Sequence, residues 1–290
     1  MSEFRSQNQK SIVEIPISSP DYPDEWKSLS DPPNVLYARG DIRLLKERKL
    51  VVVGARRTPA PALKLGTKLA KELSQALVVV TGTADGGDGA AIEGALSGGG
   101  KIICLLAGGF ASVSQNNYAL LERVAERGLL LSPHPHETPV RSFSYEYRNK
   151  LLAALGEGVL VLGAAEKSGA LITAKYAKSF QKPVFALPYF PGSAAGAGCN
   201  ALLKAGGILV ENAFDVTSVM GITYTEKKTA VVLTADEERM WQALQDMSEG
   251  HIVELSAKAG IPAFKAKAVL SALEVKGKAV ALGGNRYAAV

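Results

Sequence analysis

The sequence has few residues of the kinds that hold metals or cross-links: two cysteines and three histidines among 290 residues. Cys104 and Cys199 cannot form a disulfide framework, and Cys104 lies inside an apolar run, so a reducing, cytoplasmic environment is expected. So few thiol and imidazole groups leave little material for a structural zinc site. We therefore expect neither a metal nor a cofactor.

Long apolar segments are also lacking. No uninterrupted run approaches the ~18 residues of a membrane-spanning helix, and the first ten residues lack the apolar core of a signal peptide. Hydrophobic residues nevertheless make up 47% of the chain and charged residues 21%, which excludes wholesale disorder and allows a sizeable core. We expect a globular protein without a membrane anchor.

The net charge of +5 is unevenly distributed. Residues 230–290 contain seven basic and seven acidic residues, so the whole excess lies in residues 1–229. An excess of this size suits an anionic partner, but it also fits a solvated surface. Charge alone therefore permits nucleic-acid binding without establishing it.

From Leu50 to about Met220, short β-rich runs alternate with segments of helical periodicity. Continuous apolar runs fit strands buried on both faces, and the alternation predicts a parallel sheet with right-handed crossovers. The expected fold class is α/β: a Rossmann-like, mostly parallel sheet with helices on both faces. The expected strands are Leu50–Val53, Leu77–Thr81, Ile102–Leu106, Leu129–Ser132, Val159–Leu162, Val184–Leu187 and Ile208–Val210.

The polar stretch Gly221–Ala230 interrupts this alternation, and the chain after it has a different pattern. Three helix-like segments are followed by two short runs joined by Gly283, Gly284 and Asn285, which is hairpin chemistry. Three helices and a hairpin predict a small C-terminal winged-helix domain, and its cancelled charges favour a protein partner over DNA. The expected divisions are residues 1–40 as an N-terminal tail and extension (1–20 loose), 41–221 as a Rossmann-like DNA-binding domain, 222–230 as a linker and 231–290 as the winged helix.

Glycine-containing turns follow several of the predicted strands. Parallel strands bring such turns to one sheet edge, where free amides at helix starts can bind an anion. Arginine beside a turn would add bidentate phosphate contacts, whereas Asp85 and Asp88 in the second turn would repel a phosphate. One turn is equally well explained by structure alone, but four on one edge indicate a shared site. The candidate residues in these turns are Gly54, Arg56, Arg57, Gly82, Gly86, Lys167, Ser168 and Gly169.

Residues 141–150 interleave three aromatic with three basic residues. We interpret this segment as a loop that suits single-stranded nucleic acid, because rings stack on bases while cations follow the phosphates. The alternative is that the rings pack beneath the loop and only the charges are exposed. The candidate residues here are Phe143, Arg148, Asn149 and Lys150.

Groups suited to catalysis are scarce. No histidine follows a predicted strand beside a convincing serine or cysteine nucleophile, and no cluster of carboxylates suggests paired-metal chemistry. His134 and His136 stand in a proline-rich segment that is better explained as a surface loop than as a metal site. The sequence does not predict an enzyme.

Taken in order, these residues resemble the DNA-processing protein A family (DprA, also called Smf), from about residue 20 to residue 290. The most specific segments are Arg148–Lys150 and Ser168–Ala174. The others are Tyr22-Pro23, Pro33–Tyr37, Val52–Arg56, Gly82–Asp88, Gly94–Leu96, Phe143, Pro183–Pro188 and Gly198–Leu203. The family usually has a basic residue at Asp85, histidine at Ile92, a Tyr-Pro pair near Val113 and glutamate at Gly163, and many members have a further helical N-terminal domain.

The resemblance implies a cytoplasmic protein of natural transformation that is not an enzyme. Such proteins bind and protect incoming single-stranded DNA, form homodimers through the Rossmann-like domain and help to load the RecA recombinase. By the same resemblance, Arg56, Arg148 and Lys150 would hold phosphates and Phe143 would contact a base. Two alternatives remain open: a Rossmann-like enzyme or sensor for a small nucleotide, for which Glu166 is the nearest acid, and a protein-interaction scaffold.

Overall fold

A computed structural model describes residues 12–223 and 233–289 of the chain. The chain divides into two units, residues 1–225 and residues 226–290. Each unit has a hydrophobic core of its own. None of the helices within the described residues is long and apolar enough to span a membrane.

The first unit is built on a nine-stranded sheet in the order β1-β2-β6-β5-β4-β3-β7-β8-β9. The six pairings from β6 to β9 are parallel, and the two that add β2 and β1 are antiparallel. The strands are β1 (Val13–Pro16), β2 (Val35–Gly40), β3 (Lys49–Val53), β4 (Val78–Thr81), β5 (Ile102–Leu105), β6 (Leu129–Ser132), β7 (Val159–Val161), β8 (Val184–Ala186) and β9 (Ile208–Leu209).

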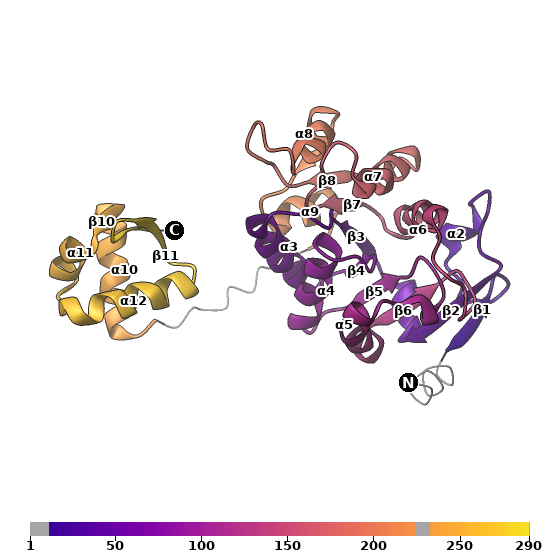
Figure 1. Ribbon diagram of the computed structural model, residues 1–290, viewed down its shortest axis with the longest axis horizontal. Helices are drawn as coiled ribbons and strands as arrows, with labels where there is room; N and C mark the ends of the chain where they lie inside the picture. The colour runs from indigo at the N-terminus through magenta and orange to yellow at the C-terminus, as the bar shows by residue number, and fades with distance from the viewer. Residues whose placement is uncertain (1–11, 224–232, 290) are drawn as a thin grey trace. The chain divides into compact units, whose positions relative to one another are not determined.

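Helices cover both faces of this sheet (Figure 1). Alternate residues of β3 show the division: Val51 and Val53 belong to one core cluster, with α6, α7 and α8, whereas Leu50 and Val52 belong to the other, with α3, α4, α5 and α9. The helices are α2 (Asp24–Lys27), α3 (Ala60–Leu73), α4 (Gly87–Ser97), α5 (Gln115–Arg127), α6 (Ser142–Leu155), α7 (Gly169–Ser179), α8 (Ala197–Lys204) and α9 (Ala213–Val219); η1 (Ile42–Lys46) and η2 (Phe110–Ser112) are short 3₁₀ turns. The predicted α/β class is confirmed, and the seven predicted strands all form.

The N-terminal extension is more ordered than we expected. Within residues 1–20, predicted as a loose tail, β1 pairs antiparallel with β2, and β2 in turn pairs with β6. The prediction of a loose tail is therefore wrong for residues 13–16. The pattern gave little sign of β1, because only Ile15 of its four residues is buried.

The second unit combines three helices with a three-stranded antiparallel sheet. Its core includes Leu244, Leu255 and Leu270, one from each helix. The tight turn between β11 and β12 uses positive φ angles at Gly283, Gly284 and Asn285, as hairpin turns of this kind require. The elements are α10 (Ala235–Met247), β10 (Glu249–His251), α11 (Ile252–Ala259), α12 (Ala263–Val275), β11 (Ala279–Gly283) and β12 (Arg286–Ala289), which is the predicted winged-helix arrangement.

Candidate nucleic-acid interface

The sheet reverses its direction of growth between β3 and β7. From β3 the chain first adds β4, β5 and β6 on one side and then returns to place β7 on the other side. In open parallel sheets, ligands bind beyond the carboxyl ends of the strands at such a switch point. A cavity of about 510 Å³ lies there, and we call it the switch pocket. Its lining includes the predicted site residues Gly54, Arg56, Arg57, Arg148, Asn149, Lys167, Ser168 and Gly169.

Close backbone contact between two glycine turns forms one wall of the switch pocket. A Cβ atom added to Gly54 would lie 2.8 Å from the Cα of Gly87. Gly86 has a φ of 77°, and a Cβ there would lie 2.4 Å from the carbonyl oxygen of Ala55. Only glycine fits these positions, so the turn after β3 packs directly against the start of α4. Gly86 thus allows the two turns to approach each other, but it does not itself line the switch pocket.

The carboxylate of Asp88 binds backbone N–H groups of the glycine turns, where we expected an external anion to bind. Its carboxylate accepts hydrogen bonds from the backbone N–H groups of Gly54 at 3.4 Å and Ala84 at 3.2 Å. Burial raises the pKa of Asp88, while the nearby Arg148 opposes that rise. The second glycine turn is therefore closed by the protein's own acid, so an external phosphate must be held by other groups.

Arg148 forms the floor of the switch pocket. The residue is only 6% exposed, and its guanidinium donates to the carbonyl oxygen of Leu105 and to Oδ1 of Asn149. Burial lowers the pKa of Arg148, but a guanidinium stays charged in proteins. Gly82 makes room for this side chain, since a Cβ there would lie 2.0 Å from Nη1 of Arg148.

Exposed cations surround that floor. Arg56, Arg57 and Lys167 are exposed and line the switch pocket. The guanidinium of Arg56 also lies over the ring of Tyr145, 5.9 Å from its centre. Next to Lys167, Ser168 caps α7, with its hydroxyl accepting from the N–H of Ala170. Positive charge and a helix start thus converge on one pocket, which suits a phosphate chain.

Residues 141–150 do not form the predicted loop. Residues 142–150 lie in α6, which carries the buried polar residues Arg148 and Asn149 on the side that faces the sheet. The three rings are divided by this helix: Tyr145 lines the switch pocket, whereas Phe143 and Tyr147 line a separate hollow of about 430 Å³. The prediction of one aromatic loop is therefore wrong, although Phe143 (62% exposed) and Tyr145 (40% exposed) both present open rings.

Lys150 faces the N-terminal extension. Its ammonium pairs with the carboxylate of Asp31 and donates to Oγ of Ser30. Tyr147, one helical turn earlier, donates its hydroxyl to the carbonyl oxygen of Asp31 at 3.0 Å. Lys150 therefore lies outside the switch pocket, in the hollow that also holds Phe143.

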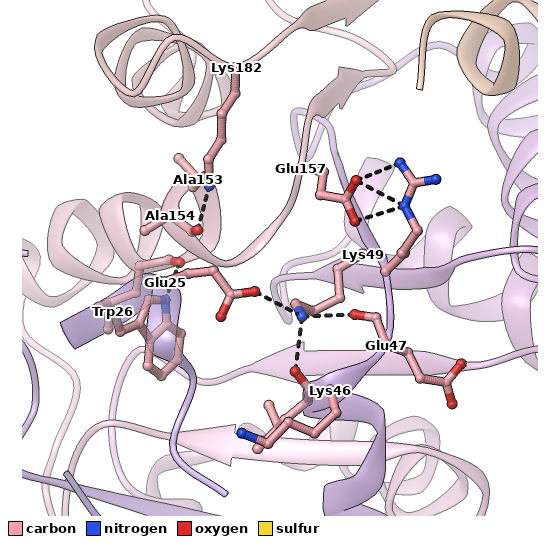
Figure 2. A network of polar contacts seen from close by, with 12 residues as sticks. Glu25, Trp26, Lys46, Glu47, Lys49, Ala153, Ala154, Glu157 and Lys182 are labelled. Carbon is pink, nitrogen blue, oxygen red and sulfur yellow. Dashed lines mark hydrogen bonds and ion pairs between the residues drawn. The ribbon is translucent and has the colours of Figure 1, made fainter. Parts of the chain in front are cut away.

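The far end of α6 is tied to the rest of the unit through its last carbonyl groups (Figure 2). Trp26 is fully buried and donates its indole N–H to the carbonyl oxygen of Leu151 at 2.8 Å. Lys182 donates to the carbonyl oxygens of Ala153 and Ala154, which end the helix. The two bonds from Lys182 satisfy carbonyl groups that a helix terminus leaves without intrahelical donors, and all three bonds hold the helix that carries Arg148.

Beneath α6, a buried lysine joins the extension to the sheet. Lys49 is 4% exposed, and its ammonium lies between the carboxylate of Glu25 at 3.0 Å and the carbonyl oxygens of Leu45 and Glu47 (Figure 2). The anchors Trp26, Asp31 and Glu25 all come from the extension that precedes β2. No spacing in the sequence connected them with the site.

Thr173 of α7 is a further pocket residue that sequence reasoning missed. Its hydroxyl is buried, lines the switch pocket and has no hydrogen-bond partner within the described residues. Thr173 lies in the segment Ser168–Ala174, which is one of the most specific segments of the family resemblance. That resemblance was the signal that could have identified Thr173 as a site residue.

The comparison with protein families decides the identity. The family model for DNA recombination-mediator protein A matches residues 14–221. The chain belongs to this family. It is 36% identical over 224 residues to the DNA processing protein DprA of Bacillus subtilis, covering 75% of each chain, and 34% identical over 197 residues to that of Streptococcus pneumoniae, covering 67% of this chain and 70% of the relative.

Solved structures of the family have the same fold. DprA from S. pneumoniae matches with a TM-score of 0.69 at 30% identity, over 78% of this chain and 79% of that chain. DprA from Helicobacter pylori matches with a TM-score of 0.66 at 30% identity, over 73% of this chain and 97% of that chain, and its structure is described for its single-stranded DNA binding mode. The resemblance to the DprA/Smf family is thus confirmed.

One departure from the family pattern has a packing reason. A Cβ at Gly163 would lie 2.6 Å from Oγ1 of Thr58 and 2.7 Å from the hydroxyl of Tyr189. That hydroxyl donates to the carbonyl oxygen of Leu162 at 2.7 Å. The space of the expected glutamate is therefore filled by these two neighbours, which leaves no room for a glutamate at position 163.

Proposed function

We propose that the chain binds single-stranded DNA along the carboxyl edge of its large sheet and acts in this way as a recombination mediator. The observation that carries the proposal is the group of exposed cations Arg56, Arg57 and Lys167 around a pocket whose floor is the buried Arg148. Guanidinium groups hold phosphates in bidentate fashion, and exposed rings of Phe143 and Tyr145 offer stacking surfaces for unpaired bases. The single-stranded DNA binding described for the H. pylori relative supports this reading.

The finer parts of the proposal come from the family. We infer a cytoplasmic homodimer that protects incoming DNA during natural transformation, helps to load the RecA recombinase and catalyses no reaction of its own. RecA loading is measured as RecA ATPase activity on single-stranded DNA coated with a single-strand-binding protein. Stimulation by the chain supports the role, and no stimulation at saturating DNA binding counts against it. Light scattering gives the oligomeric mass.

The alternative, an enzyme acting on a small nucleotide, needs a free acid at the pocket. Asp88 is the carboxylate among the described residues that line it, and its oxygens already accept two backbone N–H groups. Glu166 is exposed on the turn before α7, Asp85 is exposed on the turn after β4, and both lie outside that lining. This arrangement favours binding over hydrolysis.

Titration of labelled single-stranded and matched double-stranded oligonucleotides across a salt series tests the proposal. We expect tighter binding of the single strand, because a duplex keeps its bases stacked inside and away from the rings. We also expect the affinity to fall with salt, since each phosphate contact releases counterions. Equal or tighter binding of the duplex would contradict the proposal.

A further inference from the structure

A second cavity of about 330 Å³ lies beside the switch pocket, and we call it the acceptor pocket. Three residues, Arg56, Ala84 and Tyr145, line both cavities. The two pockets therefore meet at the Arg56–Tyr145 contact. A strand whose phosphate lies on Arg56 has the switch pocket on one side of it and the acceptor pocket on the other.

The acceptor pocket offers hydrogen-bond acceptors on Asp85, Asn117 and Ser112, beside the donors of Arg56 and Asn116. Asp85 is exposed, and its carboxylate has no hydrogen bond or ion pair with the described part of the chain. Asn117 uses one N–H of its side-chain amide to donate to the carbonyl oxygen of Thr83 at 2.8 Å, which leaves its Oδ1 as an acceptor and its second N–H as a donor. Ser112 donates its hydroxyl to the carbonyl oxygen of Gly109 at 2.6 Å and keeps acceptor capacity alone.

We propose that the acceptor pocket holds one nucleobase of the bound strand and prefers guanine, through pairing with Asp85. This proposal rests on the single-stranded DNA binding proposed above. Guanine carries N1–H and the N2 amino group side by side on its Watson–Crick edge, and two adjacent donors match the two oxygens of a carboxylate. Thymine instead presents one N–H between two carbonyl oxygens, which the carboxylate repels.

The neighbouring groups fit a base in this position. Tyr145 is 40% exposed at the boundary of the two pockets, so its ring offers a face for stacking. The guanidinium of Arg56 lies over that ring, 5.9 Å from its centre, so a phosphate held by Arg56 would be next to the stacked base. Asp85 thus sits in a pocket that combines a stacking ring, a phosphate contact and an acceptor-lined wall.

The test compares oligothymidine with strands of equal length in which isolated thymines are replaced by guanine, adenine or hypoxanthine. Isolated guanines avoid four-stranded structures, and hypoxanthine lacks the N2 amino group. Binding is followed by fluorescence anisotropy. For the wild-type protein we expect guanine-containing strands to bind at least about fivefold more tightly than oligothymidine, with adenine and hypoxanthine close to thymine.

Two variants separate pairing from charge. Asp85→Asn should bind oligothymidine at least as well as the wild type, because a negative charge is removed, but it should lose the guanine preference. Asp85→Glu keeps the carboxylate and should keep part of the preference. A preference that survives Asp85→Asn, or that adenine and hypoxanthine reproduce, overturns the assignment, since purine stacking would then explain it. Tight but equal binding of thymine and guanine strands overturns this inference alone, whereas failure to bind any single strand overturns the proposed function as well.

Discussion

The carboxylate of Asp88 accepts a hydrogen bond from the backbone N–H of Gly54, at a distance of 3.4 Å, and so joins the turns after the neighbouring strands β3 and β4. This contact places a carboxylate inside the switch pocket, close to the buried Arg148. The negative charge of Asp88 partly neutralises the positive charge of Arg148 at the pocket floor. The net attraction for phosphate therefore comes from the exposed cations Arg56, Arg57 and Lys167.

Stability should depend on pH through Asp88. Burial raises the pKa of its carboxyl above the ordinary value of 3.8, so the folded chain holds that proton more tightly than the unfolded chain does. Its contribution to the free energy of unfolding is therefore fully present below about pH 3.8 and is lost as the pH rises through the higher folded pKa. We compare the free energy of unfolding of the wild type with that of Asp88→Asn by urea titrations at several pH values. The wild-type value minus the variant value should fall as the pH rises from about 4. A difference that rises with pH would contradict this.

Arg56 should account for part of the salt dependence of DNA binding. Arg56→Ala should weaken single-strand binding and reduce the slope of log affinity against log salt by about 0.7 for each phosphate that the variant no longer neutralises. Lys68→Ala removes an exposed cation on α3, outside the described pocket linings, and is the control. Lys150→Ala should leave the slope unchanged, because Lys150 is paired with Asp31. An unchanged slope in Arg56→Ala, with the fold intact, would remove Arg56 from the site.

Gly82→Ala should disturb the pocket floor. The added methyl group would lie 2.0 Å from Nη1 of Arg148 and 2.4 Å from Oδ2 of Asp88, both of which are buried. We expect a loss of about 1–3 kcal/mol in the free energy of unfolding, together with weaker DNA binding. Gly89→Ala, in the first turns of the adjacent helix α4, is the matched control, because its nearest neighbour would lie 3.9 Å away. That variant should be as stable as the wild type or more stable by up to about 1 kcal/mol. Equal stability of the two variants would contradict the account.

The anchor between the extension and α6 can be tested with Trp26→Phe. The variant keeps a ring but removes the indole N–H that donates to the carbonyl oxygen of Leu151, which should cost about 0.5–1.5 kcal/mol in the free energy of unfolding of the first unit. Trp241→Phe is the control, since the indole N–H of Trp241 is buried and has no hydrogen-bond partner within the described residues. Chemical denaturation followed separately for each unit makes the comparison. Equal costs at both tryptophans would show that the bond to Leu151 is unimportant.

The strands of the large sheet could be predicted because they are buried on both faces, as all five residues of β3 illustrate. The winged helix could be predicted from its turn chemistry and helical spacing. The extension and residues 142–150 of α6 could not. β1 exposes three of its four residues, and this part of α6 buries Ser144, Arg148 and Asn149, so neither segment shows the apolar period that marks its structure. Buried polar residues remove the apolar pattern from which a helix is recognised, which is why residues 141–150 were interpreted as a loop.

The second unit should contribute little to DNA affinity. Within residues 230–290, seven basic residues are balanced by seven acidic ones, and ion pairs occupy Arg239, Lys258, Lys276 and Arg286. A chain that ends at residue 225 keeps both core clusters of the first unit and the whole switch pocket, so it should fold and bind single strands within about threefold of the full chain. Lys265 and Lys267 are exposed on α12, and the alternative is that α12 acts as a DNA recognition helix. Anisotropy with the full and shortened chains decides between the two, with light scattering as a check on oligomeric mass. Loss of DNA binding in a shortened chain that remains folded and keeps its oligomeric state would assign the DNA contact to the winged helix.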